Sequence, residues 1–193
     1  MMASKRRKTA DSQPFKPTKQ QLIAAAGKTV PDVIASNLRV LFCGINPGLY
    51  TAAVGHHFAR PGNRFWPALH KSGFTDRLLS PFAERELLDA GLGISNVVAH
   101  ATAAASELSK ADFIAGGRSL AAKVERYRPR IVAILGVGAY RQAFDQPKAT
   151  VGEQRGRIHN ARVWVLPNPS GLNANYQLPE LVRLFANLRT AVD

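Results

Sequence analysis

The sequence feature that most constrains the fold is a repeated alternation of short apolar runs with helical patterns. Four runs are predicted to be strands, and three of them are rich in β-branched residues: Leu38–Phe42, Ile94–Val98, Ile131–Leu135 and Arg162–Leu166. These runs are too apolar for one face to meet water, which is typical of a parallel sheet that is covered on both faces. We therefore predict an α/β fold, with a three-layer α/β/α arrangement around a central, mainly parallel sheet.

Two helices are predicted from their end signals. Ser109 is a typical helix N-cap, and Asp112 three residues later completes a capping box for a helix that ends before Pro129. The last helix is expected to begin near Pro179, since proline suits the first turn and an apolar stripe follows it.

Ligands of open α/β sheets bind at the carboxyl ends of the strands. The candidate ligand-binding loops are therefore those after Phe42, Val98, Leu135 and Leu166.

The chain, with 193 residues, has the size of one globular domain. Residues 1–17 are basic and contain two prolines and few apolar side chains, so they are predicted to form a disordered basic tail. Residues 18–29 are predicted to form a short helical lead-in, capped by Thr18 and ended by Gly27. The main domain is expected to span residues 30–193.

The formal net charge of +13 and the sequence pI of about 10.6 indicate a polyanionic partner such as nucleic acid. Residues 1–30 carry seven Lys/Arg against one acid, and the rest carry 19 against 12, so the main domain is itself basic. The single cysteine, Cys43, excludes an internal disulfide and suits a reducing cytosol. No apolar run approaches the roughly 20 residues of a membrane span, so we expect no membrane partner and a cytoplasmic location, associated with the nucleoid if the source is bacterial.

Two of the candidate loops carry residues suited to binding a base. The loop Gly44-Ile45-Asn46-Pro47-Gly48-Leu49 is stiffened by proline and glycine, and Asn46 offers both an acceptor and a donor. The loop Pro167–Asn173 places Leu172 among polar turn residues, where a leucine can act as a wedge that fills the space of an extruded base. Each loop alone also fits an ordinary structural turn.

Four segments in order carry a family resemblance. They are Gly44-Ile45-Asn46-Pro47-Gly48-Leu49, Gly55-His56-His57-Phe58 through Pro61-Gly62-Asn63-Arg64-Phe65-Trp66, Gly116-Gly117-Arg118, and Asn168-Pro169-Ser170-Gly171-Leu172. Over roughly residues 31–190 the chain resembles the mismatch-specific uracil and thymine DNA glycosylases of the uracil-DNA glycosylase superfamily. The resemblance implies a three-layer α/β fold, no metal or other cofactor, and excision of uracil, 3,N4-ethenocytosine or, in some branches, thymine opposite guanine.

The resemblance also implies roles for individual residues. Asn46 is the expected catalytic residue, which holds the attacking water, and Phe58 is expected to stack on the flipped base. The expected base-binding set is Ile45, Gly48, Thr51, His57, Phe58, Asn63 and Asn96, and the expected wedge and opposite-strand loop is Ser170, Gly171, Leu172 and Asn173. An amide cannot accept a proton at neutral pH, so Asn46 would orient the water, and backbone N–H groups such as those of Ile45 and Phe58 would meet the departing base anion.

Two positions depart from the family pattern. Thr51 stands where relatives carry a smaller alanine or serine, which disfavours the methyl group of thymine, and Ala174 stands where relatives often carry an arginine after the wedge. His56 and His57 are adjacent and lack a third spaced partner, so they make a poor zinc site, and no metal is expected.

The sequence thus predicts a monofunctional DNA glycosylase that flips and hydrolyses uracil, with ethenocytosine and thymine as further candidate bases, mainly opposite guanine. The expected partners are double-stranded DNA with a G:U or G:T mismatch or a damaged pyrimidine, and the enzymes that process the abasic site; we expect a monomer. No lysine lies in the Gly44–Leu49 loop, so a Schiff-base lyase step is not supported.

Two alternatives remain open at this point. The first is a catalytically weak protein that binds damaged DNA, since such a protein would keep the basic surface, Phe58 and Leu172. The second, a nucleotide-cofactor enzyme, starts from Gly136-Val137-Gly138, but Arg141 stands where the third glycine of a dinucleotide fingerprint belongs.

Overall fold

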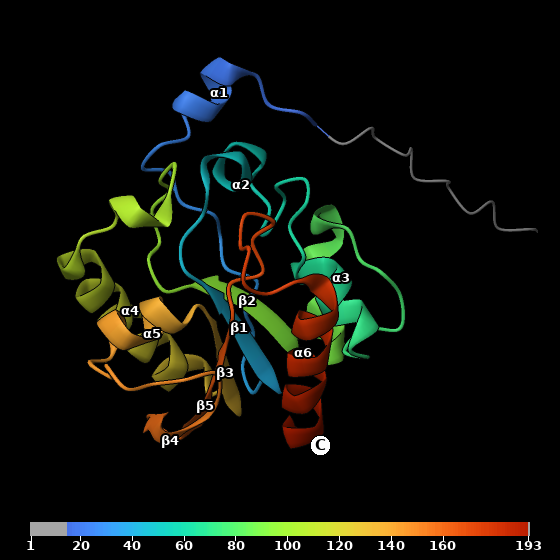
Figure 1. Ribbon diagram of the computed structural model, residues 1–193, viewed down its shortest axis with the longest axis vertical. Helices are drawn as coiled ribbons and strands as arrows, with labels where there is room; N and C mark the ends of the chain where they lie inside the picture. The colour runs from blue at the N-terminus through green and yellow to red at the C-terminus, as the bar shows by residue number, and fades with distance from the viewer. Residues whose placement is uncertain (1–14, 193) are drawn as a thin grey trace, which may run out of the picture.

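A five-stranded sheet forms the middle of the structure, a computed structural model that describes residues 15–192 (Figure 1). The strands are β1 (Val40–Gly44), β2 (Leu92–Asn96), β3 (Ile131–Leu135), β4 (Gly152–Ile158) and β5 (Ala161–Leu166), in the spatial order β2-β1-β3-β5-β4. The pairings of β1 with β2, β1 with β3 and β3 with β5 are parallel, and β4 is an antiparallel edge strand. The predicted α/β class with a mainly parallel sheet is confirmed.

Helices cover both faces of this sheet. The α-helices are α1 (Lys19–Ile23), α2 (Leu49–Val54), α3 (Phe65–Lys71), α4 (Lys110–Tyr127), α5 (Val137–Ala143) and α6 (Leu178–Val192), and the 3-10 helices are η1 (Pro81–Ala90) and η2 (Ala105–Glu107). Figure 1 shows α4 and α5 on one side of the sheet and α3 and α6 on the other. Helices α1 and α2 lie together at one end of the molecule.

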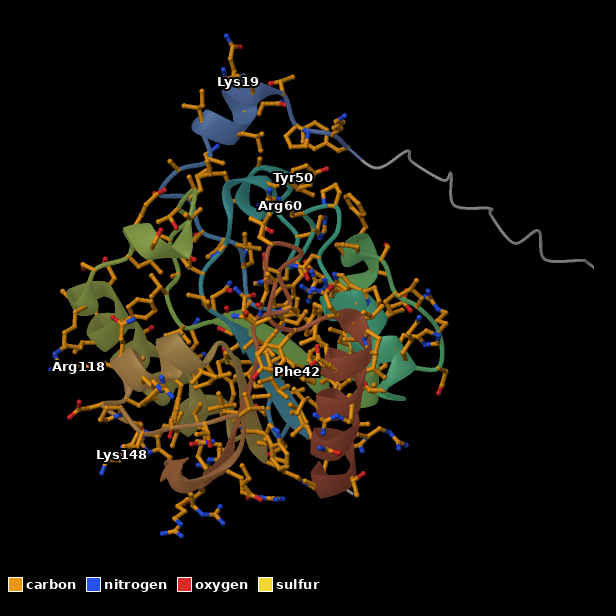
Figure 2. The ribbon with its side chains drawn as sticks, viewed as in Figure 1. Lys19, Phe42, Tyr50, Arg60, Arg118 and Lys148 are labelled. Atoms are coloured by element: carbon orange, nitrogen blue, oxygen red, sulfur yellow. The ribbon has the colours of Figure 1, made fainter. Side chains whose placement is uncertain are left out.

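The alternation of side chains along each strand divides the core into two halves. Along β1, Val40 and Phe42 belong to the core half beneath α3 and α6, whereas Leu41 and Cys43 belong to the half beneath α4. Phe42 lies in the middle of the molecule (Figure 2) and meets the Phe185 ring of α6 in a stacked arrangement, with a centroid distance of 5.9 Å. Both faces of the sheet are therefore buried, as the apolar strands predicted.

The helix ends follow the predicted capping signals. Ser109 accepts a hydrogen bond from the Asp112 N–H, and α4 runs for 18 residues. Thr18 caps α1 in the same manner, although α1 ends at Ile23 rather than near Gly27. Helix α6 begins at Leu178, one residue before Pro179.

Three strand predictions need correction. β1 lies two residues later than predicted, because Cys43 and Gly44 still pair with β2. β2 lies two residues earlier than predicted, because Leu92 and Gly93 already pair with Val40 and Leu41. β4 was missed altogether. Its sequence is polar because an edge strand meets water, so a search for apolar runs does not find it.

The predicted basic tail lies mostly outside the described residues. Only residues 15–17 of it are described, and they precede α1 without regular structure. Every helix within residues 15–192 is too short or too polar to span a membrane.

Candidate active site

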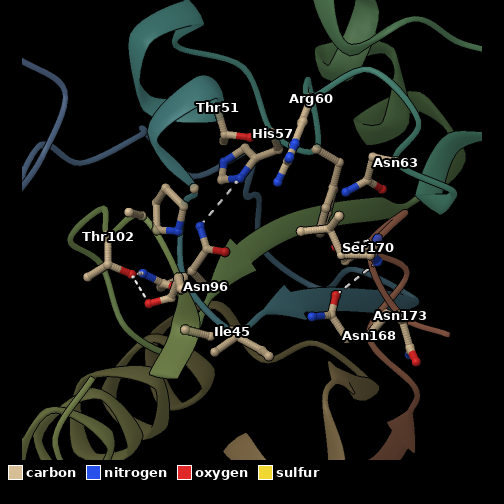
Figure 3. A pocket seen from close by; sticks show the side chains of 18 residues that line it. Ile45, Thr51, His57, Arg60, Asn63, Asn96, Thr102, Asn168, Ser170 and Asn173 are labelled. Atoms are coloured by element: carbon tan, nitrogen blue, oxygen red, sulfur yellow. Dashed lines mark hydrogen bonds between the residues drawn. The ribbon is translucent and has the colours of Figure 1, made fainter. Parts of the chain in front are cut away.

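A cavity of about 360 Å³ opens at the carboxyl ends of β1, β2 and β5 (Figure 3). It is lined by the loops that follow these three strands and by the segment between α2 and α3. Of the four loops singled out in the sequence, the one after Leu135 does not line it, so the Gly136-Val137-Gly138 segment takes no part in the cavity.

The cavity brings together nearly all the residues expected at the site. Its lining includes Ile45, Asn46, Gly48, Thr51, His57, Phe58, Asn63, Asn96, Ser170, Leu172 and Asn173. Gly171 is the exception, because it lines an adjoining pocket of about 230 Å³ together with Leu172.

Asn46 is held by its amide nitrogen. Its Nδ2 donates to the backbone carbonyl of His100 (3.1 Å) and to Oγ1 of Thr102 (2.8 Å). The Thr102 hydroxyl donates its own proton to the carbonyl of Ala104, so its oxygen must be the acceptor toward Asn46. These contacts fix the orientation of the amide, and among residues 15–192 no hydrogen bond engages its Oδ1. A free, oriented acceptor therefore lies in the cavity lining.

Phe58 is fixed on one side of its ring. Phe65 stacks against it at a centroid distance of 4.1 Å and an interplanar angle of 25°. The backbone of Phe58 adopts the left-handed region, with φ of 53°, which is rare for an aromatic residue and is seen where the surrounding structure imposes it. Because Phe65 occupies one face of the ring, a flat ligand in the cavity would stack on the other.

His57 orients Asn96. The ring of His57 is almost fully buried, and its Nε2 lies 2.9 Å from the carbonyl oxygen of Pro31, which can only accept. Nε2 therefore carries the proton, and the unprotonated Nδ1 accepts from Nδ2 of Asn96 at 3.5 Å (Figure 3). This arrangement leaves the carbonyl oxygen of Asn96 as an acceptor for a ligand.

The burial of His57 predicts a pH dependence of stability. Burial lowers the pKa of His57 below its ordinary value of 6.5, an effect larger than the opposing one of the hydrogen bond to Pro31. Between the lowered pKa and 6.5 the unfolded chain binds more protons at this position, so the free energy of unfolding rises with pH. We expect the stability contributed by the neutral form of His57 to be fully present above pH 6.5 and to be lost as the pH falls through the lowered pKa.

Urea unfolding at about pH 7.5 and about pH 5.5 measures this effect. The variant His57→Gln should show a smaller loss of stability on acidification than the parent. His159→Asn is the matched control, since His159 is exposed in the turn between β4 and β5. Equal losses in His57→Gln and the parent would show that His57 is not the group that titrates.

Asn63 and Thr51 contribute in more restricted ways than expected. Oδ1 of Asn63 accepts a hydrogen bond from the Phe65 N–H at the start of α3, which uses one lone pair of the oxygen and leaves the amide nitrogen for a ligand. Thr51 is buried on α2 and forms part of the cavity wall.

The loop that follows β5 holds its shape through its own polar side chains. Oδ1 of Asn168 accepts from the Ser170 N–H (3.1 Å), and Oγ of Ser170 accepts from the Leu172 N–H (3.2 Å). Nδ2 of Asn173 donates back to the carbonyl of Asn168 (2.9 Å). The Leu172 side chain remains 74% exposed, so this hydrogen-bonded loop holds a solvent-exposed leucine at the edge of the cavity.

The lining also contains residues that the expected site did not include, among them Thr102 and Arg60. Thr102 lies in the loop after β2, six residues beyond Asn96, so the rule for carboxyl-end loops could have found it. Arg60 is exposed and lines both the main cavity and the adjoining pocket, at the end of the molecule near α2 (Figure 2). Its position between Phe58 and Asn63 in the chain was the available signal.

The adjacent residues His56 and His57 both form a hydrogen bond with Glu84. Nδ1 of His56 lies 2.9 Å from Oε1 of Glu84, and the backbone N–H of His57 donates to Oε2 of the same carboxylate. Within the described part of the chain, no group of three His, Cys, Asp or Glu side chains is arranged to hold a metal ion.

The comparison with known protein families covers the part of the chain that forms this cavity. The family model of the uracil DNA glycosylase superfamily matches residues 31–189, which is most of the chain and includes every residue that lines the cavity. The chain therefore belongs to the uracil DNA glycosylase superfamily and is a DNA glycosylase, a hydrolase of base excision repair.

Proposed function

We propose that this protein is a monofunctional, mismatch-specific glycosylase, which flips uracil or 3,N4-ethenocytosine out of duplex DNA opposite guanine and hydrolyses the bond to deoxyribose. The product is an abasic site, which downstream repair enzymes would process. The protein would act as a monomer in the cytoplasm.

The observation that carries this proposal is the geometry of Asn46. Its amide nitrogen is bound by His100 and Thr102, and its carbonyl oxygen is available in the cavity. Such an acceptor can hold one proton of a water molecule and direct its lone pair at the anomeric carbon. An amide is not a base at neutral pH, so the reaction must depend on the departure of the base through an oxocarbenium-like state.

The rest of the cavity suits a flipped pyrimidine. The open face of Phe58 can stack on the ring, and the carbonyl of Asn96 can accept the N3–H of uracil. Among residues 15–192, no hydrogen bond is formed by the backbone N–H of Phe58, so it remains available to a developing negative charge on the base. Leu172 would fill the space that the base leaves in the duplex.

Two features support finer points of the proposal. Among residues 15–192 no lysine lines the cavity, so a covalent Schiff-base intermediate has no amine among them, and hydrolysis to a simple abasic site is favoured. Thr51 adds a branched side chain to the buried wall, and we propose that thymine is therefore a poorer substrate than uracil.

Single-turnover cleavage of labelled duplexes tests the proposal. The duplexes contain uracil, 3,N4-ethenocytosine or thymine opposite guanine, and uracil opposite adenine; each reaction is divided and one half is treated with alkali. We expect strand breaks only after alkali, with uracil opposite guanine cleaved faster than thymine opposite guanine and than uracil opposite adenine.

The other outcomes are equally specific. Breaks without alkali would contradict the monofunctional mechanism, and equal rates opposite guanine and adenine would contradict the mismatch preference. Intact strands together with tight binding would replace the proposal with a protein that recognises damaged DNA without cleaving it.

A further inference from the structure

Arg64 lies where the segment before α3 meets the loop that follows β5. Its guanidinium donates to three backbone carbonyls of that loop: Nη2 to Gly171 (2.9 Å), and Nη1 to Asn173 (3.1 Å) and to Tyr176. The backbone N–H of Arg64 also donates to the carbonyl of Pro169 (2.9 Å). One residue thus contacts the loop on both sides of Leu172.

The two segments also touch through their backbones. A Cβ atom at Gly171 would lie 2.5 Å from the carbonyl oxygen of Gly62, which is closer than any side chain tolerates. Glycine at position 171 therefore allows the loop to rest directly on the segment that carries Phe58 and Asn63. The contacts of Arg64 continue this interface on the far side of Leu172.

The chemistry of these contacts favours arginine over lysine. A planar guanidinium can satisfy several carbonyls at once from one position, whereas an ammonium group is a compact point charge. No carboxylate within residues 15–192 forms an ion pair with Arg64, so its hydrogen bonds are to the loop backbone. The side chain is partly buried beneath a loop whose own side chain, Leu172, is largely exposed.

We propose that Arg64 is a positioning residue. Its contacts hold the loop so that Leu172 can enter the duplex, and they fix Leu172 relative to the segment that carries Phe58. This inference rests on the proposed base-flipping function. A loop that is already fixed loses little conformational freedom when the leucine inserts, so the contacts of Arg64 favour the inserted state. The residue acts through Leu172 and not on the reacting atoms.

A double-mutant cycle tests this role. Arg64→Lys, Leu172→Ala and the double variant are compared in single-turnover excision of uracil opposite guanine and in dissociation from a duplex containing a tetrahydrofuran abasic-site analogue. We expect Leu172→Ala to lower excision and hasten dissociation by about tenfold, and Arg64→Lys by about fivefold. The double variant should be no worse than Leu172→Ala, because without the leucine there is nothing for Arg64 to position.

Arg141→Lys is the matched control. Arg141 also donates to a loop carbonyl, that of Ala149, through Nε (3.0 Å) and Nη2 (2.7 Å), and it does not line the cavity. The variant Arg141→Lys should leave the excision rate and the dissociation rate unchanged, even if it changes the melting temperature. Thermal unfolding of every variant confirms that it is folded at the assay temperature.

The outcomes separate the two proposals. If the effects of Arg64→Lys and Leu172→Ala multiply, Arg64 acts on general stability or on DNA contact, and the inference is wrong. If the parent protein excises no base, the proposed function fails, but dissociation from the tetrahydrofuran duplex still measures the coupling between Arg64 and Leu172.

Discussion

Replacing Asn46 with alanine should lower single-turnover excision of uracil opposite guanine by about a hundredfold or more, the scale expected when a positioned catalytic group is lost. The variant removes the oxygen that would orient the water and changes no other residue of the cavity lining. The exposed Leu172 is also untouched, so affinity for a duplex containing a tetrahydrofuran site should change by less than about threefold. The rate is measured with enzyme in excess, so that product release does not limit it.

Asn160→Ala provides the control for this prediction. Asn160 is exposed in the turn between β4 and β5, and its side chain is not part of the cavity, so excision should proceed at the parental rate. Equal excision by Asn46→Ala and the parent would remove Asn46 from the mechanism. A parallel loss of excision and of binding would instead mean that Asn46 shapes the cavity, since its amide also holds the His100–Thr102 loop.

The sheet and its two covering layers could be predicted because they depend on a repeated pattern. The interior strands β1 and β3 are apolar runs, and burial on both faces leaves no polar alternation to obscure them. The edge strand β4 has no such signal, since its residues face solvent and its pairing with β5 is irregular between Glu153 and Arg157. Pattern reasoning therefore finds the buried strands, including the buried edge strand β2, and misses the exposed edge strand β4.

The site residues could be predicted for a different reason. The loops after β1, β2 and β5 meet because parallel strands end at the same edge, so residues far apart in the sequence share one cavity. The sequence did not reveal the hydrogen bonds that determine the orientation or the tautomer of each side chain. The tautomer of His57 depends on the carbonyl of Pro31, and the orientation of Asn46 depends on Thr102; both partners are set by tertiary packing.

The Gly116-Gly117-Arg118 segment shows how a motif can be explained once its surroundings are known. Gly117 lies within α4, where glycine is normally unfavourable, but α5 packs directly against it. A Cβ atom at Gly117 would lie 2.3 Å from the carbonyl oxygen of Ala143, at the last residue of α5. The glycine is therefore needed for the close approach of two helices that cover the sheet.

Gly117→Ala should consequently destabilise the protein, although alanine is the better helix former. The gain in helix propensity is about 1 kcal/mol, whereas forcing backbone atoms apart in a packed region costs about 1–3 kcal/mol or more. Because the contact is with a backbone carbonyl and not with the end of a flexible side chain, we expect the cost to prevail, with a net loss of about 1–2 kcal/mol. Urea unfolding of the two proteins measures the difference.

Gly138→Ala is the matched comparison, because it makes the same substitution in the neighbouring helix α5. There, apart from the adjacent residues and the backbone of α5 itself, no heavy atom of residues 15–192 lies within 4 Å of the added Cβ. There only the backbone effect remains, so this variant should be more stable than the parent by about 0.5–1 kcal/mol. Opposite signs for the two variants would establish that the close contact between α4 and α5 requires glycine at position 117. If Gly117→Ala also stabilised the protein, the two helices would have to separate at little cost, and the packing explanation of the motif would fail.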